Sequence, residues 1–436
     1  MTHETIFIPY GRDCLNLSIP KENLLGVFLP NVMKTSDEPE GIIREALSKP
    51  IESPPLKEIA KGRSKAVILI SDITRPVPTR LLLPPLLDEL KGAGLSLSSV
   101  RIVVATGLHR GHTEEEKRSL VGDSIFECMV VEDHSPENCI DCGVTKSGLP
   151  VEINRTVAEA DLVICTGNID PHYFVGYTGG AKAVMPGASS KRAITATHSM
   201  MTLPGAEVGR VEGNPVRAAI EEVGDRVGID FILNVILNEK KGIVGAVAGH
   251  HVHAHRAGCS IADRMFKVHV PEKADIVVAG AGGFPKDINL YQAQKALDNA
   301  KLMVRKGGTI ILVAECVEGF GDKAFESWIT EARNPDELIE KMERQFVMGG
   351  HKALAIALTM KRANVILVSS LDSAVAAQAF FTPASTVSDA LEQSLAMHGP
   401  QARVAVIPYA GSTVPNIDAG IRLQRQGVNR AIRKTV

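Results

Sequence analysis

The sequence lacks any apolar run long enough to cross a membrane. No uninterrupted apolar stretch in its 436 residues approaches the roughly 18 residues that a transmembrane helix needs. The first four residues, MTHE, also lack the basic and then apolar order of a secretory signal peptide. We therefore expect a cytoplasmic protein that does not act on a membrane.

An excess of charge of one sign is also missing. The chain has 48 Lys and Arg against 50 Asp and Glu, which leaves a formal net charge of only −2. Such a balance creates no global field that would attract nucleic acid or an anionic membrane. The composition favours a small molecule as the ligand.

Cysteines are few and odd in number. The seven are scattered along a long chain, unlike the dense, even framework of a small disulfide-bonded domain, so we expect reduced thiols. Cys139 and Cys142 form one isolated C-x-x-C. Zinc would need two more ligands, which Cys128 or His134 supply only at poor spacing, so a metal or redox role is disfavoured.

Short apolar runs rich in Val and Ile recur between amphipathic stretches. Such runs are typical of buried parallel strands, which we expect at residues 66–71, 101–106, 161–166, 231–237, 275–279, 309–314, 364–369 and 403–408. The amphipathic stretches predict helices at residues 81–92, 113–120, 290–304 and 335–344. This alternation predicts two doubly wound α/β domains with the active site in the cleft between them.

A polar break near Pro271 marks the expected domain boundary. We expect an N-terminal domain at residues 1–268, a C-terminal α/β domain at residues 272–410 and a tail at residues 411–436. The basic end of the tail is either a helix that packs back on the N-terminal domain or a frayed segment, and the sequence leaves both open.

Polar residues follow three predicted strands at the point where each strand ends. Asp72 and Arg75 follow the first strand, His109 the second and His172 the third. Because ligands of open α/β sheets bind beyond the carboxyl ends of the strands, we expect one crevice to hold all four. Asp72 and Arg75 alone would suit a loop ion pair, but at a strand end the guanidinium suits a substrate carboxylate. The two histidines form a natural acid and base pair.

A glycine-rich loop with Gly179, Gly180 and Lys182 comes next, where the backbone can approach a ligand closely. The phosphate-binding pattern G-x-x-x-x-G-K-[ST] is not met, because Ala181 separates Gly180 from Lys182. The lysine could contact a phosphate, contact a substrate or attach a cofactor covalently, and the residues alone leave these three roles open.

Weaker signals lie further along the chain. His198, near the end of a predicted helix, is either a cap or a metal ligand. On another predicted helix, Gln292 and Lys295 share one face beside Tyr291, where the two could clamp a carboxylate from the second domain.

Two motifs look like binding sites but depart from the pattern. Residues 280–285, GAGGFP, begin as a dinucleotide fingerprint but have Pro285 at the third glycine position. An NAD-dependent hydroxy-acid dehydrogenase is therefore only an alternative function. The histidine tract at residues 250–255 resembles a metal tract, but its neighbours favour a solvated loop and a helix start.

Taken together, these motifs resemble those of the nickel-dependent lactate racemase family, from Ser71 to about Pro415. The resemblance rests on an ordered set: Asp72-x-x-Arg75, Thr106-Gly-Leu-His109, Asp170-Pro-His172, Gly179-Gly-Ala-Lys182, His198 and Tyr291-Gln292-x-x-Lys295. It implies an isomerase that racemises or epimerises a small 2-hydroxy acid, with residues 1–268 binding the cofactor and residues 272–410 closing over the substrate.

The resemblance also implies the cofactor and the roles of the residues. Lys182 matches the lysine that is linked to a nickel-pincer nucleotide, pyridinium-3-thioamide-5-thiocarboxylic acid mononucleotide, and His198 matches the nickel ligand. His109 and His172 match the residues that transfer protons, while the C2 hydrogen passes as hydride to the cofactor and back through a bound 2-oxo acid. Substrate binding is implied for Arg75, Tyr291, Gln292 and Lys295, and cofactor support for Asp72, Gly179 and Gly180.

Further expectations follow from the same resemblance. Cofactor-synthesis proteins are the implied partners, and a non-catalytic carrier of the nickel cofactor is a second alternative function. Lactate-type members place a tryptophan soon after a motif like the GGHK at residues 349–352, whereas the only tryptophan here, Trp328, lies elsewhere. We therefore expect a pocket that differs from that of lactate enzymes and admits a longer or more polar acid.

Overall fold

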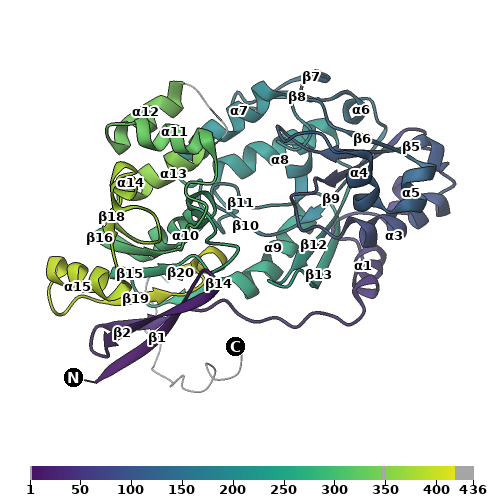
Figure 1. Ribbon diagram of the computed structural model, residues 1–436. Helices are drawn as coiled ribbons and strands as arrows, with labels where there is room; N and C mark the ends of the chain where they lie inside the picture. Colours follow the sequence, from purple (N-terminus) through teal and green to yellow (C-terminus); the bar gives the residue numbers. More distant parts are fainter. Residues whose placement is uncertain (1, 345–346, 348, 418–436) are drawn as a thin grey trace. The chain divides into compact units, whose positions relative to one another are not determined.

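The computed structural model describes residues 2–344, 347 and 349–417 (Figure 1). They form two units, which we call the larger and the smaller unit. The larger unit consists of Pro30–Lys267 and Asp336–Leu354, and the smaller unit consists of Met1–Leu29, Val268–Pro335 and Ala355–Val436. Each unit is built around its own six-stranded sheet.

All eight strands predicted from the apolar runs are present. They are β4 (Ala66–Ser71), β5 (Val100–Ala105), β9 (Leu162–Asn168), β12 (Phe231–Leu237), β15 (Ala274–Gly280), β16 (Val304–Val313), β17 (Asn364–Val368) and β19 (Val404–Ile407). The four predicted helices form as α3 (Thr79–Gly92), α4 (Glu114–Val121), α10 (Leu290–Met303) and α12 (Pro335–Arg344). The α/β fold class with parallel sheets is therefore confirmed.

The sheet of the larger unit has the strand order β13-β12-β9-β4-β5-β6, which adds β6 (Val130–Asp133) and β13 (Ile243–Gly249). Only β12 and β13 pair antiparallel. The chain runs from β4 outward to β6 and then returns to β9, so the strand order reverses beside β4. Such a reversal point is where open α/β sheets bind ligands, beyond the carboxyl ends of the strands.

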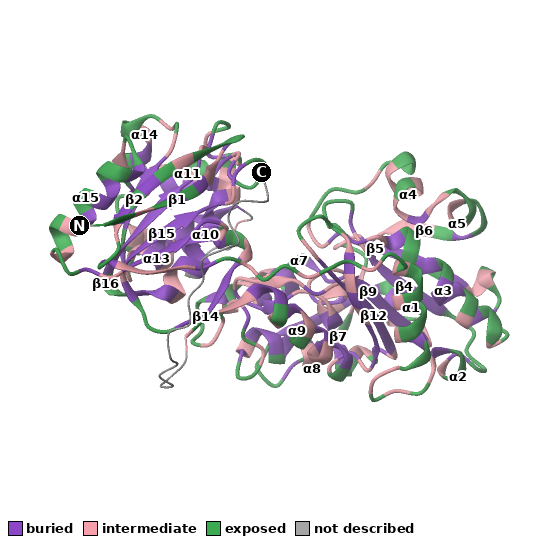
Figure 2. Cartoon of the chain, turned by 90° about the horizontal axis from the view of Figure 1, so that it is seen from below, coloured by how far each residue is buried: buried purple, intermediate pink, exposed green. Residues whose placement is uncertain are grey.

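Burial on both faces explains why these runs form inner strands. In β4 five of six residues are buried, and all seven residues of β12 are buried. Their side chains join one apolar cluster with residues of α1 (Pro39–Ser48), α2 (Leu56–Ile59) and α3. Figure 2 shows β4, β9 and β12 in the colour of buried residues.

Shorter elements of the larger unit surround the loops that follow the strands. They are α5 (Asp123–Cys128), the hairpin β7 (Cys139–Val144) and β8 (Pro150–Asn154), α6 (Arg155–Ala158), β10 (Pro171–His172), β11 (Gly176–Tyr177), the short helix η2 (Gly180–Ala183), α7 (Lys191–Ser199), α8 (Pro215–Val227) and α9 (His253–Phe266). The segment from β10 to η2 joins His172 to Lys182, so both residues belong to one continuous stretch beside the sheet.

The sheet of the smaller unit is parallel throughout, in the order β18-β17-β16-β15-β19-β3. It adds β3 (Leu24–Val27) and β18 (Thr382–Ala384), and the hairpin β1 (His3–Tyr10) and β2 (Asp13–Pro20) packs on its core. Its remaining helices are α11 (Lys323–Glu331), α14 (Ser373–Gln378) and α15 (Val387–His398), while α13 (Gly350–Met360) runs across the boundary between the units.

The loop that began as a dinucleotide fingerprint lies after β15 in the smaller unit. Phe284 N donates a hydrogen bond to Gly11 O at 2.7 Å. A Cβ added to Gly283 would lie 3.1 Å from both Gly11 O and Pro9 Cβ. The turn between β1 and β2 therefore packs directly against this loop and takes space beside its glycines.

Of the predicted tail, residues 411–417 are described. They end in β20 (Val414–Ile417), which pairs with β14 (Lys267–Val270). The basic segment 424–436, for which a helix or a frayed end was expected, lies outside the described residues. No helix in the described ranges has the length and apolar character that crossing a membrane requires.

Candidate active site

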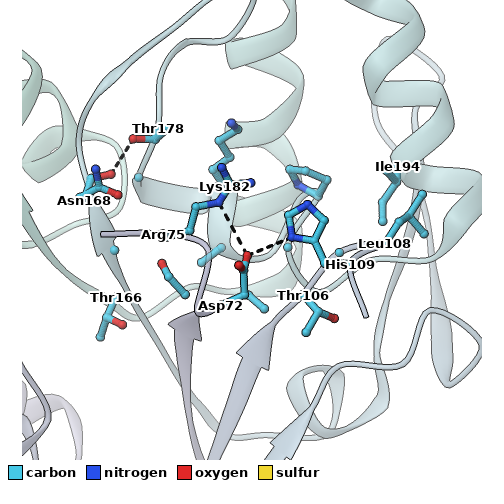
Figure 3. Close-up of a pocket in the computed structure, with 18 of the residues that line it drawn as sticks. Asp72, Arg75, Thr106, Leu108, His109, Thr166, Asn168, Thr178, Lys182 and Ile194 are labelled. Atoms are coloured by element: carbon cyan, nitrogen blue, oxygen red, sulfur yellow. Dashed lines mark hydrogen bonds and ion pairs between the residues drawn. The ribbon is translucent and has the colours of Figure 1, made fainter. Parts of the chain in front are cut away.

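A cavity of about 160 Å³ lies at the carboxyl ends of β4, β5 and β9 in the larger unit (Figure 3). A single water needs only roughly 10–15 Å³ of such space, so a small organic molecule fits. Six of the residues singled out in the sequence line it: Asp72, Arg75, His109, Gly179, Lys182 and His198. The prediction that strand ends bring these side chains together holds for this set.

Asp72 connects the loops that follow β4 and β5. Its Oδ2 lies 3.3 Å from His109 Nδ1 and 3.6 Å from Arg75 Nε, as Figure 3 shows. Burial opposes ionisation of this 3% exposed residue, but hydrogen bonds from His109 and Thr74 and the charge of Arg75 lower its pKa to about 2. An ionised Asp72 accepts the Nδ1 proton of His109, which leaves the lone pair of the neutral ring on Nε2, as a general base requires.

His172 lies in β10 and is half-buried. Val175 N donates to its Nδ1 at 3.4 Å, and its ring contacts the rings of Tyr173 and Phe174 at centroid distances of 5.0 and 4.8 Å. Burial first, and then the positive charges of Lys182 and other nearby cations, lower its pKa well below the usual value. The ring is therefore neutral at neutral pH, and a bound anion would oppose this effect.

Lys182 lies in η2 and lines the cavity. Burial, and after it the charges of Arg75 and Arg217, lower the pKa of its amine well below the usual value. A neutral amine is nucleophilic, so this environment suits a covalent role better than a permanent ion pair with phosphate. Beside it, Gly179 has a φ of +81°, and a Cβ there would lie 2.8 Å from Asn234 Oδ1.

His198 is in the last turn of α7. Its Nδ1 donates to Ile194 O at 2.8 Å, so the neutral ring carries its lone pair on Nε2. Burial lowers its pKa to about 4, an effect that the Ile194 carbonyl opposes and the charge of Lys182 reinforces. A neutral, oriented imidazole that faces the same cavity as Lys182 has the form of a metal ligand.

His112 is a site residue that the sequence reasoning missed. Its Nδ1 lies 2.7 Å from Asp133 Oδ1, and its Nε2 accepts a hydrogen bond from Ile73 N at 3.1 Å. Ile73 lies between Asp72 and Arg75, so His112 anchors the loop that holds both. The signal available in the sequence was a second histidine three residues after His109, on the same strand-end loop.

Three further residues of the larger unit lie around His172 and His198. The His351 ring is 6.4 Å from the rings of both His198 and Tyr173, and Lys352 Nζ lies 5.1 Å from the centre of the Tyr173 ring. His351 and Lys352 are both buried. The GGHK motif was visible in the sequence, but its distance along the chain hid this proximity.

Gln292, Lys295 and Tyr291 lie on α10 of the smaller unit, where Lys295 Nζ donates to Gln292 Oε1 at 2.9 Å. The shared helix face that their spacing predicted is therefore present, and their contact with substrate stays a prediction. Gly180, the other glycine of the predicted set, donates its N–H to Asn234 Oδ1 at 2.7 Å.

The histidine tract at residues 250–255 has structural contacts. His251 Nε2 lies 2.9 Å from Asp225 Oδ1, and His255 Nε2 donates to Thr178 O at 2.8 Å. Within the described part of the chain, no group of three or more His, Cys, Asp or Glu side chains is arranged to hold a metal ion. Cys139 and Cys142 lie partly buried in β7 as free thiols.

Two family models match the chain. The lactate racemase N-terminal domain matches residues 10–209, and the lactate racemase C-terminal domain matches residues 270–414. A lactate racemase of Thermoanaerobacterium thermosaccharolyticum is 33% identical over 421 residues, which cover 94% of this chain and 98% of that protein. A lactate racemase of Lactiplantibacillus plantarum is 32% identical over 415 residues, covering 92% and 97%.

Solved structures agree with these matches. The lactate racemase apoprotein from T. thermosaccharolyticum superposes with a TM-score of 0.85 at 33% identity, covering 95% of this chain and all of that one. A protein from Thermotoga maritima, with a TM-score of 0.62 at 20% identity, shares the fold. With both domain models matched and two relatives aligned over nearly their full length, the chain belongs to the lactate racemase family and is an isomerase that acts on a small molecule.

Proposed function

We propose that this enzyme racemises or epimerises a small 2-hydroxy acid with a nickel-pincer nucleotide attached to Lys182. One observation carries the proposal: an Asp72-oriented base, a lysine with a depressed pKa and a neutral histidine line one cavity. In this proposal the base is His109, the attachment point is Lys182 and the metal ligand is His198.

The residues present fit the proposed group. The amine of Lys182 is neutral and therefore competent for an amide-type linkage, and the Nε2 lone pair of His198 provides one nitrogen donor. Gly179 leaves room for a flat ring, because its backbone borders the cavity without a side chain. A single nitrogen beside soft sulfur donors is a ligand set that suits Ni(II).

When bound, the nickel group supplies an acceptor and donor for the hydrogen on C2 of the substrate. Arg75 binds the substrate carboxylate through its planar guanidinium, which is exposed at the pocket and close to Asp72. His109 Nε2 then removes the proton of the 2-hydroxyl group, and Asp72 stabilises the imidazolium that forms. The substrate becomes a bound 2-oxo acid while Arg75 retains the carboxylate.

His172 serves the opposite enantiomer. Racemisation needs a proton donor and acceptor for each orientation of the hydroxyl group, and two histidines from different strand ends meet this need. The negative charge of a bound carboxylate offsets the cations that lower the pKa of His172 in the free protein. Substrate binding therefore makes His172 a stronger base at the moment when it is needed.

The same proposal includes roles outside the pocket of the larger unit. Gln292 and Lys295, with Tyr291 beside them, hold the substrate when residues 272–410 close over it, as the sequence predicted. Cofactor-synthesis proteins deliver the nucleotide, and the enzyme works in the cytoplasm with the seven cysteines as free thiols.

For the substrate, the relatives point to lactate as the first acid to test. The tryptophan expected of lactate-type pockets is absent after GGHK, and Trp328 is buried in α11 of the smaller unit. We therefore propose that the enzyme accepts a longer or more polar 2-hydroxy acid. A panel of single enantiomers tests this, and lactate turning over far better than every larger acid would reject it.

The chemistry is tested with protein made alongside the cofactor-synthesis machinery. Intact-mass spectrometry should show an adduct that the Lys182→Ala variant lacks. A substrate deuterated at C2 should keep its deuterium in the product, because hydride transfer is internal, whereas exchange with solvent would contradict the mechanism. His109→Ala and His172→Ala should keep the adduct and lose racemisation.

The alternatives predict other outcomes. An adduct without any isomerase activity on the panel would favour a carrier of the cofactor. Turnover that requires added NAD would favour a dehydrogenase. No adduct on the wild-type protein would reject covalent attachment at Lys182.

A further inference from the structure

Arg217 is a fully buried arginine whose side chain is only 1% exposed, in the first turn of α8. Its guanidinium donates to three backbone carbonyls of the segment that joins His172 to Lys182. Nε donates to Val175 O at 3.4 Å, Nη1 to Gly179 O at 3.4 Å and Nη2 to Tyr177 O. One side chain thus binds every second carbonyl of a five-residue stretch.

Other side chains hold the remaining polar groups of this segment. Asn214, the N-cap of α8, donates to Phe174 O at 3.0 Å. His255 donates to Thr178 O at 2.8 Å, and Asn234 Oδ1 accepts from Gly180 N at 2.7 Å. The segment that carries Lys182 is therefore held mainly by side chains from neighbouring elements.

An arginine suits this role better than any other residue. Its planar group presents five donors in a fixed fork, whereas a lysine presents a flexible point charge. Its acidic partner Glu221 lies 3.9 Å from Nε and also pairs with Arg256 at 2.5 Å, so the three carbonyls supply much of the compensation for the buried charge. Because burying a charge is costly, fold stability alone does not call for an arginine here.

We propose that Arg217 is a positioning residue of the active site, which fixes the loop at residues 175–179 and thereby the placement of Lys182. The part that concerns attachment rests on the proposed function, and the part that concerns the loop does not. The positive charge also acts on the lysine, because Arg217 is one of the two cations that depress the pKa of Lys182.

The loop part is tested on protein without cofactor. Backbone amides of residues 175–187 are followed by hydrogen–deuterium exchange in the wild type, Arg217→Met and Arg256→Met. Arg256 is the matched control, because it shares Glu221 but donates to no carbonyl of the loop. We expect exchange about tenfold faster or more in Arg217→Met, since the carbonyls lose their donors and the loop opens more often, and little change in Arg256→Met.

Arg217→Lys keeps the experiment decisive if Arg217→Met does not fold. It retains the charge but not the fork, so we expect loop exchange between that of the wild type and that of Arg217→Met. Wild-type exchange of the loop in folded Arg217→Lys and Arg217→Met, or equal acceleration in Arg256→Met, would overturn the proposal.

The functional part is read from the adduct and from kinetics. In loaded protein we expect Arg217→Met to carry less adduct on Lys182 than Arg256→Met, and its kcat per loaded site to fall about tenfold or more with a smaller change in KM. A lower amount of folded protein alone would leave kcat per loaded site unchanged. If even the wild type carries no adduct, attachment fails, while the exchange data still decide the role of Arg217 in the loop.

Discussion

His109 Nδ1 lies 3.3 Å from Asp72 Oδ2, in a pair built from the ends of two neighbouring strands. Asp72 is almost fully buried, whereas the His109 side chain is 39% exposed at the pocket. The carboxylate therefore sets the tautomer and orientation of the ring, while the ring remains accessible to substrate.

The first prediction concerns this pair. Asp72→Asn should lower kcat for racemisation about 100-fold or more, because a neutral amide neither selects the same tautomer nor stabilises the imidazolium. Initial rates with each enantiomer, followed by circular dichroism, give kcat and KM. Asp225→Asn is the control, since Asp225 pairs with His251 outside the cavity lining. Equal kcat in the two variants would contradict the assignment of His109 as the oriented base.

The second prediction concerns the charge around His172. The pKa of His172 is lowered by burial and by several cations, including Arg75. Arg75→Met removes one cation, which favours the protonated ring, so the pKa of His172 should rise. NMR titration of histidine side chains in unloaded protein measures this, with His172→Gln to assign the signal. Arg75→Lys keeps the charge and should leave the pKa near that of the wild type, and a pKa that falls in Arg75→Met would show that the charges act otherwise.

The third prediction concerns His112. His112→Ala removes the acceptor for Ile73 N and should loosen the loop that holds Arg75. We expect KM to rise about tenfold, as the loss of one hydrogen bond of about 1 kcal/mol in positioning the carboxylate contact implies, with a smaller effect on kcat. His112→Gln retains an acceptor and should recover part of the change. If His112→Ala lowered kcat alone, His112 would act on the base rather than on Arg75.

The fourth prediction separates backbone strain from crowding in the lysine loop. Gly179 has φ +81° and ψ −175°, a conformation open almost only to glycine, and a Cβ there would lie 2.8 Å from Asn234 Oδ1. Gly228 also has a positive φ, but a Cβ there meets nothing within 4 Å. Gly228→Ala should cost about 1–2 kcal/mol of unfolding free energy. Gly179→Ala should cost about 2–3 kcal/mol or more and also reduce the adduct on Lys182.

Chemical denaturation measures both glycine costs, and intact mass measures the adduct. Gly228→Ala should load as well as the wild type, since it changes no contact of the loop. Equal loading of both variants would show that the loop tolerates displacement and that the placement of Lys182 is less strict than we propose.

The sequence by itself determined the inner strands and the strand-end residues. Runs such as AVILIS in β4 and FILNVIL in β12 are apolar without alternation, which only strands buried on both faces require. Because parallel strands end at one edge, Asp72, His109 and Lys182 were predictable neighbours before any coordinates. Motif spacing, rather than residue physics, pointed to the covalent role of Lys182.

Only the tertiary structure decided the contacts that cross long stretches of chain. β3 joins the sheet of the smaller unit beside β19, nearly 400 residues later, and its four half-buried residues carry no periodic signal of that partner. His112, Arg217 and His351 look like surface or helix residues in sequence, and their roles depend on which backbone lies within about 3 Å, a distance set by packing of whole elements. Local patterns encode strands and helices, whereas the hold on the lysine loop comes from side chains that tertiary packing brings to it.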